Sequence, residues 1–216
     1  MRFAVAAVVL AMFASAAHAD DWMPLFNGRG LSGWRANNDP ESFAVVDGAL
    51  RVQASGKTSA HLFYVGERNE GFEAFRNFEL EAVCRAEPNA NGGIFVHTDM
   101  SIRDAQKHLA KGYEVQLNST AKEKRKTGSL YAVIDLEKSP VDETKWFTVR
   151  VTVREKRITV ALDGKQVVDY TEPADVVRPK ERTGRVFAAD GGAIALQAHD
   201  ARSVWYFREI RVKRLP

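Results

Sequence analysis

Gly112-Tyr113-Glu114-Val115-Gln116-Leu117 is the stretch from which the fold can be predicted most directly. Its apolar side chains alternate with a carboxylate and a carboxamide, which is the two-residue period of a strand with one face in the core. Glu114 and Gln116 therefore point the same way, away from the core. A carboxylate can act as a general base or acid, and a carboxamide can both donate and accept hydrogen bonds. An ordinary solvated strand face would look the same in this hexapeptide taken alone.

The rest of the chain repeats this alternation in about eleven short segments separated by turn residues. The segment Phe78 to Arg85 and the segment Trp146 to Arg154 are the clearest, and Asp47-Gly48 and Asp163-Gly164 are typical of hairpin turns. Residues 102–110 form the one predicted helix. This pattern predicts an all-β antiparallel sandwich or barrel, and a single domain of this size suits a two-sheet jelly roll over residues 20–216.

Residues 1–19 have the features of a secretory signal peptide. A positive start at Arg2 precedes an apolar run from Phe3 to Phe13, and Ala17-His18-Ala19 fits a cleavage site. The apolar run is short for a membrane span, and no later stretch is long enough, so we expect no membrane insertion. We expect a periplasmic or secreted protein that begins at Asp20.

Charge and cysteine content exclude several classes of partner and site. The formal net charge of the whole chain is +3, and loss of Arg2 with the leader would leave +2. This near balance predicts no nucleic-acid partner, and we interpret the basic residues Lys122, Lys124, Arg125 and Lys126 as a solvated loop. Cys84 is the single cysteine, so an intrachain disulfide and a multi-thiolate zinc site are both excluded. The oligomeric state is not predicted.

Strand parity brings further polar residues to the face of Glu114. Ile94 and Val96 suit the core and leave Phe95 and His97 opposite. Ile194 and Leu196 likewise leave Gln197 and His199, and Leu130 leaves Tyr131. If these strands share one sheet, its outer face carries acid, amide, imidazole and aromatic groups. Sugars need such planar hydrogen-bonding partners and aromatic surfaces. Each residue alone has a structural explanation, since a histidine or tyrosine on a strand is usually a packing residue.

Sequence motifs exclude other enzymes. The chain has no G-x-S-x-G nucleophile elbow, no phosphate-cradling glycine loop and no H-E-x-x-H zinc motif. The strand predicted over residues 112–117 offers one acid, whereas ordinary glycoside hydrolysis uses a pair of carboxylates.

The chain resembles the 3-keto-disaccharide hydrolase family in an ordered set of short blocks. These run from Leu25-Phe26-Asn27-Gly28, with Leu31, Gly33 and Trp34, through Asp47-Gly48, Asn91-Gly92-Gly93-Ile94-Phe95, Gly112-Tyr113-Glu114-Val115-Gln116, Thr127-Gly128-Ser129-Leu130-Tyr131, Trp146, Leu162-Asp163-Gly164 and Leu196-Gln197-Ala198-His199 to Phe207-Arg208-Glu209-Ile210. The resemblance implies a jelly roll of the concanavalin A-like lectin and glucanase type. It also implies hydrolysis of glycosides whose sugar is a ketone at C3.

That chemistry needs only one carboxylate. The ketone acidifies the hydrogen on C2, so a base can remove it, the enolate can expel the group on C1, and water can add afterwards. We expect Glu114 as base or acid with His199 as its rival, and Arg208, Gln116 or a bound cation as the enolate stabiliser. Catalytic residues are thus predicted as Glu114 and His199, and substrate-binding residues as Asn91, His97, Gln116, Tyr131, Gln197 and Arg208. No organic cofactor is expected, and a divalent cation is left open.

The carbohydrate could also be bound without reaction. A carbohydrate-binding module and a conventional glycoside hydrolase therefore remain the alternative predictions for this chain.

Overall fold

The computed structural model describes residues 21–68 and 70–216, and it folds them into two antiparallel sheets. Short 3-10 turns, η1 (Pro40–Ser42) and η2 (Lys180–Arg182), are its only helical elements in the described residues. The predicted all-β sandwich is confirmed. The predicted signal peptide, residues 1–19, lies outside the described residues. No helix in the described part of the chain has the length and apolar character that crossing a bilayer requires.

The larger sheet has eight strands. Its order is β11 (Lys165–Thr171), β10 (Arg157–Leu162), β9 (Phe147–Arg154), β6 (Phe78–Ala86), β13 (Trp205–Arg214), β4 (Ala49–Val52) and β3 (Phe43–Val46), with β1 (Met23–Phe26) also paired to β13. Asp47 and Asp163 have positive φ values of 49° and 45°. Each sits before a glycine in the turn of a hairpin, β3–β4 or β10–β11, as the Asp-Gly pairs predicted.

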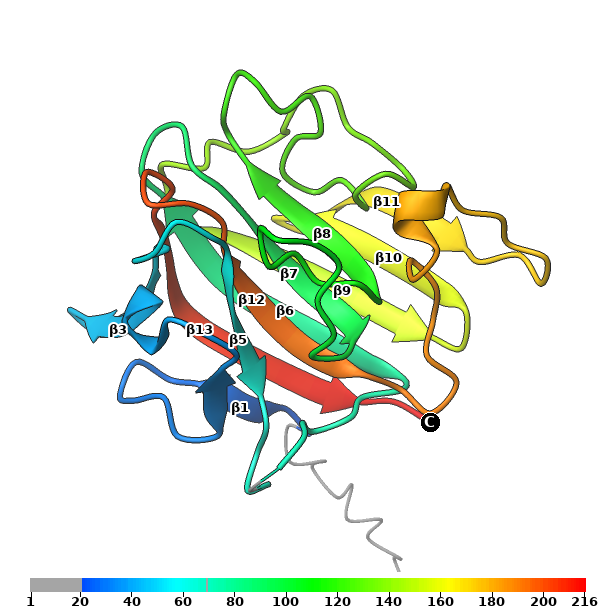
Figure 1. Ribbon diagram of the computed structural model, residues 1–216, viewed down its shortest axis with the longest axis horizontal. Helices are drawn as coiled ribbons and strands as arrows, with labels where there is room; N and C mark the ends of the chain where they lie inside the picture. The colour runs from blue at the N-terminus through cyan, green and yellow to red at the C-terminus, as the bar shows by residue number, and fades with distance from the viewer. Residues whose placement is uncertain (1–20, 69) are drawn as a thin grey trace, which may run out of the picture.

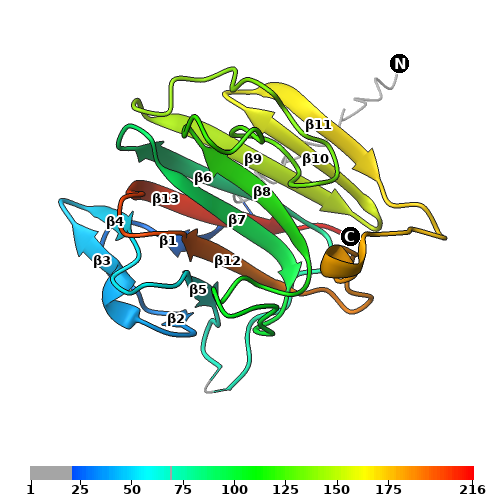
Figure 2. The same cartoon turned by 45° about the horizontal axis from the view of Figure 1, so that its top comes forward.

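The smaller sheet has five strands and carries the residues on which the functional argument rests. Its order is β2 (Trp34–Ala36), β5 (Ala60–Tyr64), β12 (Ala193–Ala198), β7 (Asn91–Thr98) and β8 (Tyr113–Asn118). Figures 1 and 2 show its strands layered over those of the larger sheet and running in roughly the same direction. The stretch that opened the sequence analysis thus forms β8, an edge strand of this sheet.

The inner faces of the two sheets form one apolar core. Along β9, the side chains of Phe147, Val149, Val151 and Val153 are at most 2% exposed, while the residues between them face outward. Val115 and Leu117 of β8 enter the same core from the smaller sheet, as parity predicted. Cys84 is fully buried there, and burial raises the pKa of its thiol, which makes it an inert core residue.

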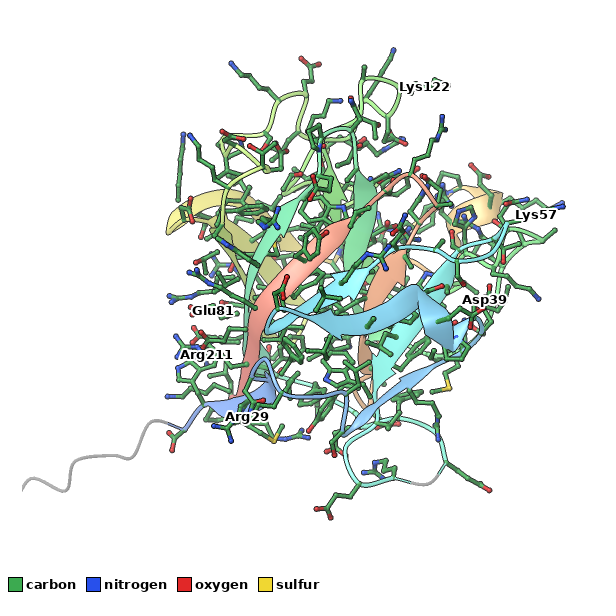
Figure 3. All side chains as sticks on the ribbon, turned by 90° about the vertical axis from the view of Figure 1, so that its left-hand side faces the viewer. Arg29, Asp39, Lys57, Glu81, Lys122 and Arg211 are labelled. Carbon is green, nitrogen blue, oxygen red and sulfur yellow. The ribbon has the colours of Figure 1, made fainter. Side chains whose placement is uncertain are left out.

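The outer face of the larger sheet is covered by paired charges. Glu81 accepts two hydrogen bonds each from Arg150 and Arg211, the shortest 2.6 Å (Figure 3). Burial alone would raise the pKa of Glu81, but these guanidinium groups lower it overall. This face therefore presents satisfied ion pairs.

Two predicted elements differ in the structure. The helix predicted over residues 102–110 is absent, and Ile102 and Leu109 instead form an isolated antiparallel bridge. The strand predicted around Ser129 to Ala132 is a turn in which Leu130 bridges both Val115 and Ile134. In both segments short-range periodicity is overridden by hydrogen bonds within the loop and to neighbouring strands.

Gly92 and Gly93 lie within strand β7. A Cβ atom on Gly92 would lie 3.0 Å from the Trp205 ring, and one on Gly93 would lie 3.0 Å from Glu114 Oε1. These glycines are therefore needed for close side-chain packing on the two faces of the sheet.

Candidate functional site

A cavity of about 170 Å³ lies against the outer face of the smaller sheet, roofed by loops. One water molecule needs about 10–15 Å³ of such volume, so the cavity can hold several waters or a ligand on the scale of one sugar ring. Six of the eight predicted site residues line it, namely Asn91, Glu114, Gln116, Tyr131, Gln197 and His199. The lining also includes Phe95, Arg103, His108, Leu109, Glu123, Arg182 and Arg185.

A row of residues across three strands forms the floor of this cavity. Gly93 of β7 is the direct cross-strand partner of both Gln116 in β8 and Gln197 in β12. Neighbouring strands are about 4.8 Å apart, so the two glutamines stand on either side of a residue that has no side chain. Gln116 Nε2 donates to Asn91 Oδ1 at 2.9 Å, whereas Gln116 Oε1 and Gln197 Oε1 have no hydrogen-bond partner in the described residues.

Glu114 is buried beside an arginine that the sequence analysis did not predict. Arg185 Nη2 donates to Glu114 Oε2 at 2.7 Å, and the two side chains are only 6% and 9% exposed. Arg185 also lies 5.7 Å from the Phe95 ring and 5.3 Å from the Tyr131 ring.

The segment 172–192 carries Arg185 to this position (orange in Figure 1, between β11 and β12). Arg178 Nε donates to the carbonyl of Arg185 at 2.9 Å, and the amide of Gly112 donates to the carbonyl of Gly184 at 2.9 Å. Further along, the amide of Phe187 donates to Glu172 Oε2 at 2.9 Å. The backbone on both sides of Arg185 is thus tied to the sandwich.

His61 of β5 is the cross-strand partner of Gln197 and lies beside its amide on the same face of the sheet. Burial, followed by the nearby His108 and His199, lowers the pKa of His61 from 6.5 to about 3, so the ring is neutral near pH 7. Gln197 Nε2 lies 3.3 Å from His61 Nε2. A neutral ring nitrogen can accept this hydrogen bond, and the amide oxygen of Gln197 is then left for another partner.

Two histidines at the cavity wall are each oriented by an aspartate. His199 Nδ1 lies 2.9 Å from Asp200 Oδ2, and His108 Nδ1 lies 2.9 Å from Asp104 Oδ2. Burial opposes the change, but hydrogen bonds led by that from His199 lower the pKa of Asp200. An ionised aspartate holds the proton on Nδ1, so Nε2 of a neutral ring can accept a proton.

His199 also borders a second pocket. This pocket has a volume of about 620 Å³ and shares Asn91, Glu123 and His199 with the cavity, and its remaining wall includes Pro88, Lys122 and Arg202. His199 therefore lies in the wall of both spaces.

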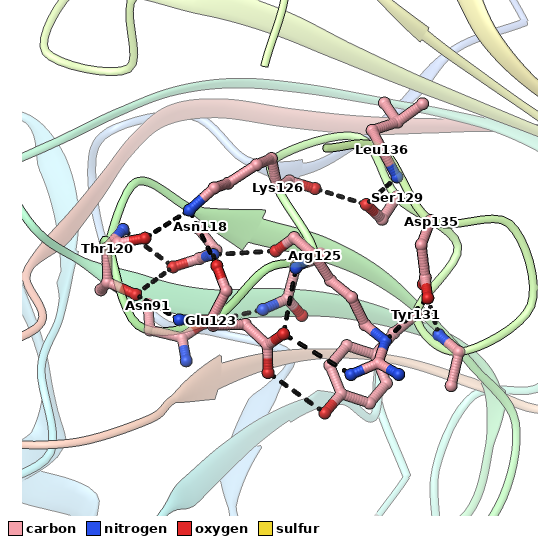
Figure 4. Close-up of polar contacts among 12 residues, drawn as sticks. Asn91, Asn118, Thr120, Glu123, Arg125, Lys126, Ser129, Tyr131, Asp135 and Leu136 are labelled. Atoms are coloured by element: carbon pink, nitrogen blue, oxygen red, sulfur yellow. Dashed lines mark hydrogen bonds and ion pairs between the residues drawn. The ribbon is translucent and has the colours of Figure 1, made fainter. Parts of the chain in front are cut away.

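The loop that follows β8 brings Glu123 and Tyr131 to the cavity (Figure 4). Asn118 Nδ2 donates to the carbonyls of Glu123 and Arg125 at 3.0 and 2.8 Å, and Lys126 Nζ donates to the carbonyl of Glu123 at 2.8 Å. Arg125 pairs with Asp135 at 3.0 Å. Part of the basic cluster therefore holds the loop together. Burial, then Glu123 and Glu114, raises the pKa of Tyr131, which keeps its phenol protonated.

His97 is not in the cavity, which corrects the parity prediction. Its φ is +53°, and the pairing of β7 with β12 shifts register between Ala193 and Ala195. This irregularity breaks the alternation of faces. The His97 ring lies 4.9 Å from that of Phe187, and its Nε2 lies 2.8 Å from the carbonyl of Arg76. His97 is a buried packing residue.

Arg208 is also placed elsewhere than predicted. It lies in β13 of the larger sheet, at a register shift between Phe207 and Glu209, with its guanidinium 5.0 Å from the exposed Trp146 ring. Strand alternation was not informative here because it says nothing about which of two sheets a strand joins.

The cavity residues that the sequence analysis missed come from loops. Arg103 and His108 lie in the segment between β7 and β8, Glu123 follows β8, and Arg182 and Arg185 lie between β11 and β12. The length of the connection 172–192 was the available signal, since long loops in compact domains are commonly functional. Across residues 21–68 and 70–216, no group of three or more His, Cys, Asp or Glu side chains is placed to hold a metal ion.

Comparison with known proteins identifies the family. The sequence profile of the 3-keto-alpha-glucoside-1,2-lyase-like domain matches residues 21–213. The chain belongs to this family. This confirms the resemblance inferred from the sequence blocks and supports an activity on carbohydrates. No curated protein matches the chain.

Several solved structures share the fold. Two are proteins of Parabacteroides distasonis described as candidate glycosyl hydrolases. One is 19% identical with a TM-score of 0.74, covering 90% of this chain and 94% of that chain, and the other is 22% identical with a TM-score of 0.62, covering 90% and 99%. The carbohydrate-binding module CBM66 of Bacillus subtilis is 16% identical with a TM-score of 0.54, covering 84% and 96%. At these identities the likeness establishes the jelly-roll fold.

Proposed function

We propose that this protein cleaves glycosides whose sugar is oxidised to a ketone at C3. The observation that carries the proposal is the buried Glu114 carboxylate in a sugar-sized cavity between two glutamines, in a chain of the 3-keto-alpha-glucoside-1,2-lyase-like family. The oxidised ring occupies the cavity, and the leaving group occupies the second pocket beyond His199.

The reaction begins with removal of the C2 proton by Glu114. The electron pair of the C–H bond forms a C2=C3 double bond, and the carbonyl pair moves onto the C3 oxygen as an enolate. The enolate then restores the C3 carbonyl, forms a C1=C2 double bond and expels the C1 oxygen, which takes a proton from His199. Water adds across this C1=C2 bond: its hydroxyl bonds to C1, its proton goes to His199, and Glu114 returns the proton to C2. In a variant of this scheme, His199 removes the C2 proton and Glu114 protonates the C1 oxygen.

A conventional glycoside hydrolase is the second candidate because Glu123 adds a second carboxylate to the cavity. Such an enzyme needs one carboxyl group protonated as general acid. Here Glu114 is bonded to Arg185, and Glu123 lies 3.5 Å from the Arg125 guanidinium. Both carboxyl groups are thus paired with an arginine and neither is set apart as the acid, which makes this chemistry the weaker proposal. A binding module without catalysis is the third.

One comparison distinguishes these functions. The protein is incubated with a 3-keto-glycoside and, separately, with its unoxidised parent, and the released sugar is measured by NMR. We expect release from the keto form only. Release from the parent would favour the conventional hydrolase, and saturable binding with no release from either would favour a binding module.

Export to the periplasm or the medium is part of the proposal, on the basis of residues 1–19. N-terminal sequencing of the protein produced in its natural host should give Asp20 as the first residue, and an intact Met1 would contradict export by cleavage.

A further inference from the structure

Three buried polar atoms of residues that line the cavity have no hydrogen-bond partner among the described residues. They are Arg185 Nη1, Gln116 Oε1 and Gln197 Oε1, in side chains of residues that are 5%, 2% and 4% exposed. A buried polar group without a partner costs about 1–3 kcal/mol, so such atoms are usually satisfied by something that binds. All three belong to residues that line the same cavity.

These three atoms define a complementary ligand. The guanidinium can only donate, so it requires an oxygen acceptor, and the amide oxygens can only accept, so they require hydroxyl donors. Gln116 and Gln197 stand on opposite sides of Gly93, which leaves space for a ring between them. A sugar carbonyl flanked by a hydroxyl on each neighbouring carbon has this pattern, and an unoxidised ring does not require the charged donor.

We propose that Arg185 binds the ketone oxygen of the substrate and stabilises the enolate that forms from it. This inference rests on the proposed function and assigns to Arg185 the role that the sequence analysis offered to Arg208, Gln116 or a cation. Arg185 is then a catalytic residue, and it makes the site selective for the oxidised sugar.

The ion pair between Arg185 and Glu114 explains how one guanidinium can serve the whole step. Before reaction its Nη2 is bonded to the negative carboxylate at 2.7 Å. When Glu114 takes the C2 proton, the carboxylate becomes neutral and the negative charge appears on the C3 oxygen. The cation therefore has an anion beside it throughout, which is the preorganised stabilisation that lowers such barriers.

The anchoring of the backbone supports a fixed position for the guanidinium. The carbonyl of Arg185 accepts from Arg178, its amide donates to the carbonyl of Arg182 at 2.9 Å, and the carbonyl of Gly184 accepts from Gly112. A planar fork held in this way can address the carboxylate with one nitrogen and the sugar oxygen with the other, which a lysine ammonium could not reproduce.

The test measures binding of free 3-keto-glucose and of glucose by titration calorimetry, since neither carries an aglycone, and loss and return of the C1 hydroxyl would leave the sugar unchanged. Wild type should prefer the keto sugar, and Arg185→Gln should reduce the ratio of the two dissociation constants about 10–100-fold. Arg185→Lys should give an intermediate ratio, and it replaces Arg185→Gln as the test variant if Arg185→Gln does not fold. Arg208→Gln, on the other sheet, is the matched control and should keep the wild-type ratio.

Repeating the titrations in a Glu114→Gln background separates direct contact from positioning. If Arg185 touches the sugar, Arg185→Gln still lowers the keto preference in that background, because the effect does not pass through the carboxylate. An unchanged ratio there, or in the single variant, would overturn the inference. A wild-type protein that prefers the keto sugar but releases nothing from 3-keto-glycosides would instead contradict the proposed function alone.

Discussion

At the scale of single residues, the site depends on one glycine as much as on its charged groups. Gly93 stands opposite Gln116 and Gln197, and the Glu114 side chain lies over it. Without a Cβ at this position, the carboxylate can lie flat against the sheet and pair with Arg185. The chemistry of Glu114 is therefore set by its neighbours in the sheet rather than by its own strand.

Glu114→Gln keeps the shape of the side chain and removes its basic oxygen. The amide oxygen can still accept from Arg185, so we expect the fold and KM to change little. The value of kcat on a 3-keto-glycoside should fall about 10²–10⁴-fold if Glu114 is the base. Glu209→Gln, exposed on the larger sheet, is the control. Wild-type kcat in Glu114→Gln would assign the proton transfer to His199.

Gly93→Ala tests the position of Glu114 without changing any polar group. The new Cβ would lie 3.0 Å from Glu114 Oε1 and 3.1 Å from its Cγ, so the carboxylate must move. Because small displacements of a reacting group are costly, we expect kcat to fall about tenfold or more with little change in the free energy of unfolding. Gly30→Ala, whose Cβ would meet nothing within 4 Å, should behave as wild type in the same kinetic assay.

At the scale of elements, strands and loops contributed differently to prediction. Parity placed Glu114, Gln116 and Gln197 on the cavity face because β8, and β12 from Ala195 to Ala198, pair with β7 without a shift in register. It failed for His97, where a positive φ interrupts β7. Arg185 and His108 could not be found by any periodicity, since they lie in loops whose position depends on hydrogen bonds to distant strands. The sequence thus predicts the strand residues that form the floor of the cavity. The loop residues that cover it are known only from the folded structure.

Glu172→Gln tests whether the segment 172–192 positions Arg185. Glu172 accepts hydrogen bonds from the Tyr113 hydroxyl at 2.5 Å and from the amide of Phe187 at 2.9 Å, and its side chain is 3% exposed. We expect a loss of about 1–3 kcal/mol in the free energy of unfolding. We also expect kcat on a 3-keto-glycoside to fall about tenfold.

Glu181→Gln, an exposed change in the same segment, should alter neither quantity measured for Glu172→Gln. Lower stability with wild-type kcat in Glu172→Gln would mean that this anchor does not control Arg185.

At the scale of the whole molecule, the sandwich divides its two outer faces between structure and function. The larger sheet presents mutually paired charges such as Glu81 with Arg150 and Arg211 (Figure 3). The smaller sheet presents buried polar groups that have no partner within residues 21–68 and 70–216. Buried polar groups without partners lower the stability of the fold. Their concentration on one face therefore indicates that this face serves binding and not stability.

The buried histidines predict how the stability of the whole fold depends on pH. Burial lowers the pKa of His61 from 6.5 to about 3, and burial also lowers the pKa of His97. Below pH 6.5 the unfolded chain binds more protons at these rings than the folded chain does, so the free energy of unfolding must fall as the pH falls. For one such histidine the slope approaches about 1.4 kcal/mol per pH unit.

Urea denaturation at intervals between pH 7.5 and 4.5 measures this slope before most carboxylates titrate. His61→Gln keeps a polar side chain next to Gln197 but cannot be protonated, so we expect a shallower decline than in wild type, by up to the slope of one histidine. His97→Gln should lessen the decline in the same direction, because its ring is also buried. Equal slopes in wild type and His61→Gln would mean that His61 accepts a proton in the folded protein, in which case the amide of Gln197 could not donate to its Nε2.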